Sequence, residues 1–295
     1  MAVLAPLLRA IGYEVHEHPD VDWVEVGMFS LMAMPSTAPP GADAGAIADL
    51  LLRTGRTAAN FVTVGRGVPA AAWWVRDPGY GPHSLQRQFR QNLRRGAGRT
   101  EVRPLDPEEL HRFGGRVHAD ATEARGGAAS RPMTDGWWDR LCGAAASTPG
   151  VEAIGCFVDR ALAGFVLAHT RGGLCEGLVA SVSPRFTDAR PAHALYHGFA
   201  TEMIRRSGIR GVSLGRTSIP PVASLDAFKK HAGFLPEPVR VGVVLHPRRR
   251  WLAAPVVRAA LHLSARMAGR RLRGLANVAL LDAAAATAAE PEGAS

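Results

Sequence analysis

The chain has 295 residues, 47% of them hydrophobic and 21% charged, which is enough for one large or two smaller domains with hydrophobic cores. It has no apolar stretch of about 18 residues, and its N-terminal apolar run is too short for a secretory signal, so we expect neither a membrane span nor export. Cys142, Cys156 and Cys175 lack metal-ligand spacing and form an odd set, which predicts free thiols in a reducing cytoplasm.

The net charge of +9 is concentrated near the C-terminus. Residues 239–281 contain no Asp or Glu and carry nine arginines, as many as the net charge of the whole chain. Arginines alternate with apolar residues from Arg248 to Arg273, which predicts a basic amphipathic helical tail over residues 247–281. Such a helix lies peripherally on an anionic membrane surface, contacts tRNA phosphates, or packs on the domain with its arginines outward. We expect residues 282–295 to be disordered.

Residues 1–80 are predicted to form a small α/β unit. Apolar runs over Val21–Met34, Phe61–Val64 and Ala70–Val75 indicate strands. Proline and glycine over Pro35–Gly41 indicate a loop, and Ala46–Arg53 indicates a short helix.

A basic helix is predicted over Ser84–Arg95, inside a linker that spans residues 81–100. Ser84 suits the N-cap, and the apolar residues of the helix recur every four positions and so share one face. Three arginines lie on another face: Arg87, Arg90 and Arg94. That face either binds phosphate or nucleic acid or is simply solvated, and we favour the solvated surface.

The pattern over residues 101–246 predicts one domain with the order β-α-α-β-β-β-α-β-α-β, a mixed sheet with helices on its faces. Asp106 suits the N-cap of the first helix. The central helix starts at Pro191, where a missing amide proton costs nothing, and closes near Gly208. In chain order the predicted elements are Glu101–Leu105, Pro107–Arg125, Asp135–Ala146, Val151–Val158, Leu162–His169, Gly173–Val182, Pro191–Arg206, Gly211–Leu214, Ser224–His231 and Arg240–Leu245.

The junction between the strand ending at Val182 and the helix starting at Pro191 is a candidate ligand site. Unpaired amides and the helix dipole at the start of a helix suit an anion such as phosphate. We therefore predict donor binding by Val182, Arg190 and Ala192, and we expect the two strands that flank the helix to separate and present free amides to the donor. The alternative is an ordinary strand–helix unit in an α/β core.

Three stretches resemble the FemAB-like branch of the GNAT acyltransferase superfamily. They are Ser84–Arg95 with the EVRPL that follows, Val179–Tyr196, and SLGRTSIPPVASLDAFKKHAGFLPEP at Ser213–Pro238. The resemblance implies a GNAT-like α/β (α+β) fold, with a mixed sheet flanked by helices over residues 101–246 and a smaller, degenerate GNAT-like half before it. It also implies acyl transfer to an amine or hydroxyl of a small or cell-envelope-related acceptor, with acetyl-CoA or another acyl-CoA as donor.

The loop before the central helix departs from that pattern. Acetyl-CoA users in this fold carry Gln/Arg-x-x-Gly-x-Gly/Ala there, whereas RFTDAR, from Arg185 to Arg190, has no glycine, so backbone approach to a pyrophosphate is less open. Some FemAB-like proteins use aminoacyl-tRNA, which is the alternative donor here. A third hypothesis is a non-catalytic membrane-surface module that keeps the fold.

Acyl transfer requires a base for the acceptor, donors for the oxyanion and a proton for the leaving group. Glu176 stands in an apolar strand, where burial would raise its pKa and suit a base; the alternative is a solvent-facing residue. On the central helix, His193 and His197 suit proton transfer and Tyr196 suits protonation of the leaving group, although all three are also typical of helix packing.

Two cationic positions are candidates for substrate or donor binding. Arg216 follows a strand end, where open α/β sheets bind ligands, and a guanidinium suits a phosphate or carboxylate. The family match implies that Lys229 or Lys230, after Phe228, binds donor phosphates; the alternative is a solvated pair. We predict no metal site, because no third ligand has spacing that matches His193 and His197.

Overall fold

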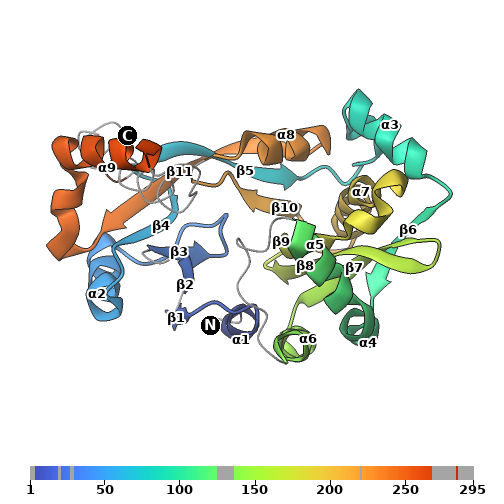
Figure 1. The fold of residues 1–295 in the computed structure, drawn as a ribbon, viewed down its shortest axis with the longest axis horizontal. Helices are drawn as coiled ribbons and strands as arrows, with labels where there is room; N and C mark the ends of the chain where they lie inside the picture. Colours follow the sequence, from blue (N-terminus) through green and yellow to red (C-terminus); the bar gives the residue numbers. More distant parts are fainter. Residues whose placement is uncertain are drawn as a thin grey trace.

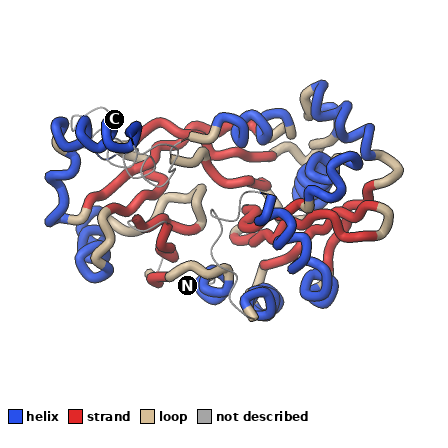
Figure 2. The backbone as a smooth tube through the Cα atoms, viewed as in Figure 1, coloured by secondary structure: helices blue, strands red, loops and turns tan. Residues whose placement is uncertain are grey.

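The computed structural model describes residues 4–18, 21–26, 30–124, 136–219, 221–267 and 284. Its centre is one mixed sheet of eleven strands, in the order β1-β2-β3-β4-β11-β5-β10-β9-β8-β7-β6. Figure 1 shows the N-terminal strands at one end of an elongated molecule and the green and yellow elements at the other, and Figure 2 shows strands running between the two ends.

The N-terminal half supplies one end of this sheet and part of its middle. The run over Val21–Met34 forms two antiparallel strands rather than one, paired from Asp22↔Met34 to Val26↔Ser30. Asp43 caps the first helix after them, because its carboxylate accepts from Ala46 N at 2.8 Å. The elements are α1 (Ala5–Ala10), β1 (Val15–Glu17), β2 (Asp22–Val26), β3 (Ser30–Met34), α2 (Ala44–Thr54), β4 (Ala58–Thr63) and β5 (Val68–Val75).

A short 3-10 turn, η1 (Pro82–Ser84), and the helix α3 (Arg87–Gly96) connect the two halves. The N-cap of α3 is Gln86, so the expected cap at Ser84 is wrong: Ser84 belongs to the preceding turn. The apolar face of α3 is buried as predicted, and Phe89 is only 1% exposed.

The C-terminal half packs helices on both faces of four antiparallel strands, β6 (Thr100–Leu105), β7 (Val151–Val158), β8 (Ala161–Arg171) and β9 (Leu174–Val182). One face carries α4 (Pro107–Glu109), η2 (Leu110–Gly114), α5 (Gly115–Ala124) and α6 (Trp137–Ser147), and the other carries α7 (Pro191–Ile204), after the turn η3 (Pro184–Ala189). The single helix predicted over Pro107–Arg125 is thus interrupted by a π-helical segment. Asp106 caps it as expected, accepting from Glu109 N at 2.7 Å.

Two strands and a helix join the halves: β10 (Gly211–Arg216), α8 (Ala223–His231) and β11 (Leu235–Leu245). The strand β11 is longer than predicted, because its first part pairs with β5 from Leu235↔Trp74 and its second part with β4 down to Leu245↔Ala58. A C-terminal strand therefore lies between two N-terminal strands. The division into separate domains near residues 80–100 stays a prediction.

The basic tail begins with η4 (Pro247–Ala253) and α9 (Pro255–Met267). Partly buried Leu252, Ala253 and Leu261 pack against a small core on β4 and β11, which Ala284 also joins. Residues 268–283, and the predicted disordered end apart from Ala284, lie outside the described residues. Within the described part of the chain, no helix is both long and apolar enough to cross a membrane.

Candidate functional site

The strands β9 and β10 pair in parallel over three residues and then separate. Their last pair is Ser213↔Glu176, after which β9 continues along β8 and β10 continues along β5, which it already pairs from Val212↔Val75, to Arg216 opposite Ala72. Gly215 has a φ of 75°, a conformation that glycine adopts without strain, so the chain can turn here. Beyond Glu176, the edge of β9 that faces β10 has no strand partner among the described residues, which matches the expected separation.

Glu176 lies at the point of separation and is only 7% exposed. Its carboxylate accepts hydrogen bonds from Ser36 Oγ at 2.5 Å and from Thr37 Oγ1 at 3.0 Å. Both hydroxyls belong to the loop after β3, in the N-terminal half. Burial raises the pKa of Glu176, and the hydrogen bonds from Ser36 and Thr37 and the charge of Arg216 limit that rise.

Arg216 and Lys229 lie near this carboxylate. Arg216 Nη2 donates to Asn60 Oδ1 on β4, and Lys229, only 3% exposed, donates from Nζ to the Arg216 carbonyl oxygen at 3.4 Å. Burial lowers the pKa of Arg216 to about 10 and also lowers the pKa of Lys229, while the charge of Glu176 acts in the opposite direction on both. We call this group the central polar cluster: Ser36, Thr37, Asn60, Glu176, Arg216 and Lys229.

The structure thus brings together three of the residues predicted from the sequence, Glu176, Arg216 and Lys229. No sequence pattern predicted the other three residues of the cluster, Ser36, Thr37 and Asn60. Ser36 and Thr37 stand in the proline-rich loop PSTAPP, where hydroxyl side chains are common turn residues, so their type alone gave no functional signal.

His193 and Tyr196 lie elsewhere, in an aromatic cluster between three helices. Phe89 of α3 contacts His193 of α7 and Phe228 of α8, with ring centroids 4.6 and 5.6 Å apart, and Tyr196 lies 5.1 Å from Phe228. His193 Nε2 lies 3.0 Å from Asn92 Nδ2. Burial, with a smaller contribution from Arg190, lowers the pKa of His193, so the ring is neutral near pH 7. These contacts are those of packing side chains.

The start of α7 is closely covered by its neighbours. Arg190 is the N-cap, in a left-handed conformation, and Pro191 is the first helical residue as predicted. A Cβ on Gly96 of α3 would lie 2.4 Å from the Ala189 carbonyl oxygen, so the end of α3 rests directly on the residue before the cap. Ala192 is half-buried, and so is Val182, which packs into the main core.

The loop before α7 is also fixed from the other face of the sheet. Asp120 of α5 accepts hydrogen bonds from Ser183 Oγ at 2.8 Å and from Arg185 Nη2 at 2.9 Å. Two residues earlier in α5, His118 Nδ1 lies 2.9 Å from Ser181 Oγ at the end of β9. The Arg185 side chain is therefore engaged in holding the loop to α5.

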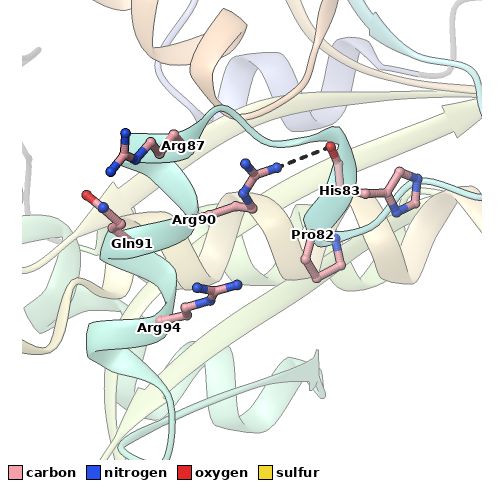
Figure 3. A pocket seen from close by; sticks show the side chains of 6 residues that line it. All are labelled: Pro82, His83, Arg87, Arg90, Gln91 and Arg94. Carbon is pink, nitrogen blue, oxygen red and sulfur yellow. Dashed lines mark hydrogen bonds between the residues drawn. The ribbon is translucent and has the colours of Figure 1, made fainter.

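The outer face of α3 borders a cavity of about 560 Å³, lined by Pro82, His83, Arg87, Arg90, Gln91 and Arg94 (Figure 3). Arg90 Nη1 donates to the His83 carbonyl oxygen at 3.5 Å. Within the part of the chain that the structure describes, none of the three arginines forms an ion pair with a carboxylate. This surface is therefore an open, uncompensated basic cavity.

The sequence profile of the acetyltransferase (GNAT) domain matches residues 83–230, half of the chain. The chain belongs to the GNAT family. No curated protein matches the sequence. Among solved structures the chain is similar to FemX, at 12% identity and a TM-score of 0.54 over 84% of this chain and 92% of FemX.

Two further solved structures have the same fold. One is the C-terminal domain of a putative lysylphosphatidylglycerol synthetase from Agrobacterium fabrum, at 14% identity and a TM-score of 0.50 over 81% of this chain and 86% of that one. The other is L-PGS from Bacillus licheniformis, at 11% identity and a TM-score of 0.50 over 90% of this chain and 92% of that one. The predicted GNAT-like α/β fold is thereby confirmed, and it is the fold of FemX.

GNAT domains generally take acyl-CoA, and the residues beside Arg190–Tyr196 restrict its approach to the start of α7 here. The space between α7 and α8 is filled by the rings of Phe89, His193, Tyr196 and Phe228. The loop before α7 has no glycine, and α3 rests on its last residue. No group of three or more His, Cys, Asp or Glu among the described residues forms a metal site.

Proposed function

We propose that this GNAT protein transfers an acyl group from a carrier to an amine or hydroxyl, and that Glu176 is its general base. The observation that carries the proposal is the buried Glu176 carboxylate, held by Ser36 and Thr37 where β9 and β10 separate. A carboxyl whose pKa is raised by burial takes a proton more readily near neutral pH than an exposed one does.

The proposed transfer requires the acyl donor, the acceptor and Glu176, and no further reactant. Glu176 takes the proton of the acceptor amine or hydroxyl as the acceptor attacks the acyl carbonyl carbon. The oxyanion of the tetrahedral intermediate is stabilised by unpaired amides on the edge of β9 beyond Glu176. When the bond to the carrier breaks, the proton held by Glu176 passes to the leaving oxygen or sulfur. The roles predicted for His193 in proton transfer and for Tyr196 in protonation of the leaving group stay proposals.

The donor predicted first, an acyl-CoA, is disfavoured by the start of α7, where the preceding loop has no glycine and α3 rests on its last residue. A specific observation favours the second candidate, an acyl group esterified to tRNA: the basic cavity on α3 offers Arg87, Arg90 and Arg94 to phosphates. We therefore propose aminoacyl-tRNA as the better-supported donor.

For the acceptor we propose a small molecule or cell-envelope precursor, supported by the name of one structural neighbour, a putative lysylphosphatidylglycerol synthetase. The basic tail supports peripheral contact of a cytoplasmic protein with an anionic membrane, because Trp251 is 62% exposed and follows Arg248, Arg249 and Arg250.

The test is a transfer assay with the purified protein, each donor class and a panel of amine and hydroxyl acceptors. We expect acylated product with aminoacyl-tRNA, and we expect Glu176→Gln to lower kcat by roughly 10²–10⁴-fold. Glu101→Gln, an exposed carboxylate on β6, is the matched control and should retain full activity. Equal rates for the two variants would refute the role of Glu176, and transfer from acetyl-CoA alone would refute the tRNA donor.

A further inference from the structure

The two cations of the central polar cluster lack counter-ions. Within the described residues neither Arg216 nor Lys229 has a carboxylate within ion-pair distance, although both are close enough to Glu176 to feel its charge. Asp226 acts on Lys229 from the same helix, also without an ion pair. The Glu176 carboxylate itself is engaged by the hydroxyls of Ser36 and Thr37. A buried lysine and a half-buried arginine therefore lie near one buried carboxylate that is already hydrogen-bonded.

The hydrogen-bonding capacity of these cations is also mostly unused. Among the described residues, Nη2 of the Arg216 guanidinium has a hydrogen-bond partner, whereas Nε and Nη1 are buried without one. Lys229 is 3% exposed and makes one hydrogen bond, to the Arg216 carbonyl oxygen at 3.4 Å. Buried donors of this kind are nearly always paired in folded proteins, so unpaired ones indicate a group that binds there.

We propose that Arg216 and Lys229 form an anion subsite for a carboxylate or phosphate that the acceptor carries beside its reacting amine or hydroxyl. We assign the anion to the acceptor, because the acceptor's nucleophile must meet Glu176, and this assignment rests on the proposed function. A carboxylate and a phosphate each have several lone pairs that accept hydrogen bonds from converging N–H groups. The substrate class is thus an acidic acceptor rather than a neutral amine.

The subsite is tested by thermal unfolding of the full chain at pH 7 in inorganic phosphate or in acetate, at constant ionic strength set with chloride. We expect one of the two anions to raise the Tm of the wild-type protein by about 2 °C or more, since a ligand that binds only the folded state stabilises it. A response to phosphate identifies a phosphate group on the acceptor, and a response to acetate identifies a carboxylate.

The variants separate this subsite from general surface charge. We expect Lys229→Met and Arg216→Gln to lose the anion response, and Lys230→Met, the exposed neighbour on the same helix, to keep it. In the absence of added anion, Lys229→Met should have a Tm equal to or above that of the wild type, because it removes a buried charge without an ion pair. No response of the wild type to either anion, or an unchanged response in Lys229→Met, would overturn the subsite.

Failure of this inference is distinguishable from failure of the proposed function. Glu176→Gln removes the proposed base and the nearby negative charge together. We expect it to lose transfer activity yet to bind the anion more tightly than the wild type, with a larger Tm shift. If Glu176→Gln keeps its activity, the proposed base is wrong; if it loses activity and the wild type shows no anion response, only the subsite is wrong.

Discussion

At the scale of single residues, the pKa of Glu176 is set by two opposing influences. Burial disfavours its charged form, whereas the hydroxyls of Ser36 and Thr37 stabilise that form. Those hydroxyls belong to a loop of the N-terminal half, and Ser36 lies 140 residues before Glu176 in the chain. The protonation of Glu176 therefore depends on this loop. The N-terminal half thereby acts on the proposed base directly, and not only as a scaffold.

Ser36→Ala should raise the pKa of Glu176 further, because it removes a 2.5 Å hydrogen bond to the charged carboxylate. A hydrogen bond to a charged group contributes about 1.5–3 kcal/mol, which corresponds to roughly 1–2 pKa units. We expect the rising limb of the pH dependence of kcat/KM to move to higher pH by about one unit. Ser224→Ala, an exposed serine on α8, is the control and should leave the limb in place. An unmoved limb in Ser36→Ala would show that the hydroxyl does not act on the base.

The raised pKa of Glu176 also predicts how stability depends on pH. With a pKa above its unfolded value of 4.5, Glu176 binds a proton more tightly in the folded state. Its contribution to the free energy of unfolding is therefore largest below pH 4.5 and falls as the pH rises toward the folded pKa. We expect the difference in that free energy between the wild type and Glu176→Gln, measured by urea unfolding, to decrease over this interval. A difference that stays constant with pH would mean that the folded pKa is not raised.

At the scale of secondary-structure elements, α3 has two faces with different roles. Its apolar face places Phe89 against His193 of α7 and Phe228 of α8, which fills the space between these two helices. Its basic face borders the open cavity of Figure 3. The face that we interpreted from sequence as a solvated surface is thus hollowed and forms no ion pairs with the described residues, which favours the phosphate-binding alternative.

Replacing Arg87, Arg90 and Arg94 together by Gln should weaken the binding of tRNA. Each lost phosphate contact lowers the slope of log K against log salt by about 0.9 on a duplex, so the triple variant should lose roughly two to three units of slope. Arg53, Arg95 and Arg205 replaced together by Gln carry the same change of charge, on exposed positions outside the cavity, and should bind as the wild type does. Equal weakening in both triple variants would assign the effect to net charge instead of the cavity.

Local sequence pattern predicted those elements that are stabilised by local interactions. The start of α7 at Pro191 and the cap at Asp106 follow from one or two turns of chain, and both are confirmed. The contact of Ser36 with Glu176 follows from no periodicity, because tertiary packing alone brings these residues together. Tertiary packing also decides the neighbours of Phe89: its apolar spacing predicted an apolar helix face but not the helices that this face contacts.

At the scale of the whole molecule, the eleven-stranded sheet makes the halves interdependent. The strand β5 lies between β11 and β10, and β11 lies between β4 and β5, so strands from both halves alternate at the centre. The sequence could not predict this arrangement, since Leu245 pairs with Ala58 and the strand motif of β11 is compatible with any partner. The central polar cluster sits where this interleaving brings Asn60 beside Arg216.

Interleaved strands predict that the two halves unfold together. Unpairing β11 from β4 and β5 removes two ladders of hydrogen bonds at once. If the N-terminal half unfolds, β10 also loses β5 as its partner. We expect hydrogen exchange, followed by mass spectrometry across a urea series, to give one common midpoint for peptides from β2–β3 and from β7–β9. A protein that starts at residue 81 should fail to reach a folded, soluble state, because it lacks β5 and both hydroxyls that hold Glu176. Two separate midpoints, or a stable fragment that shows the native exchange pattern in β7–β9, would instead establish independent domains joined only by α3.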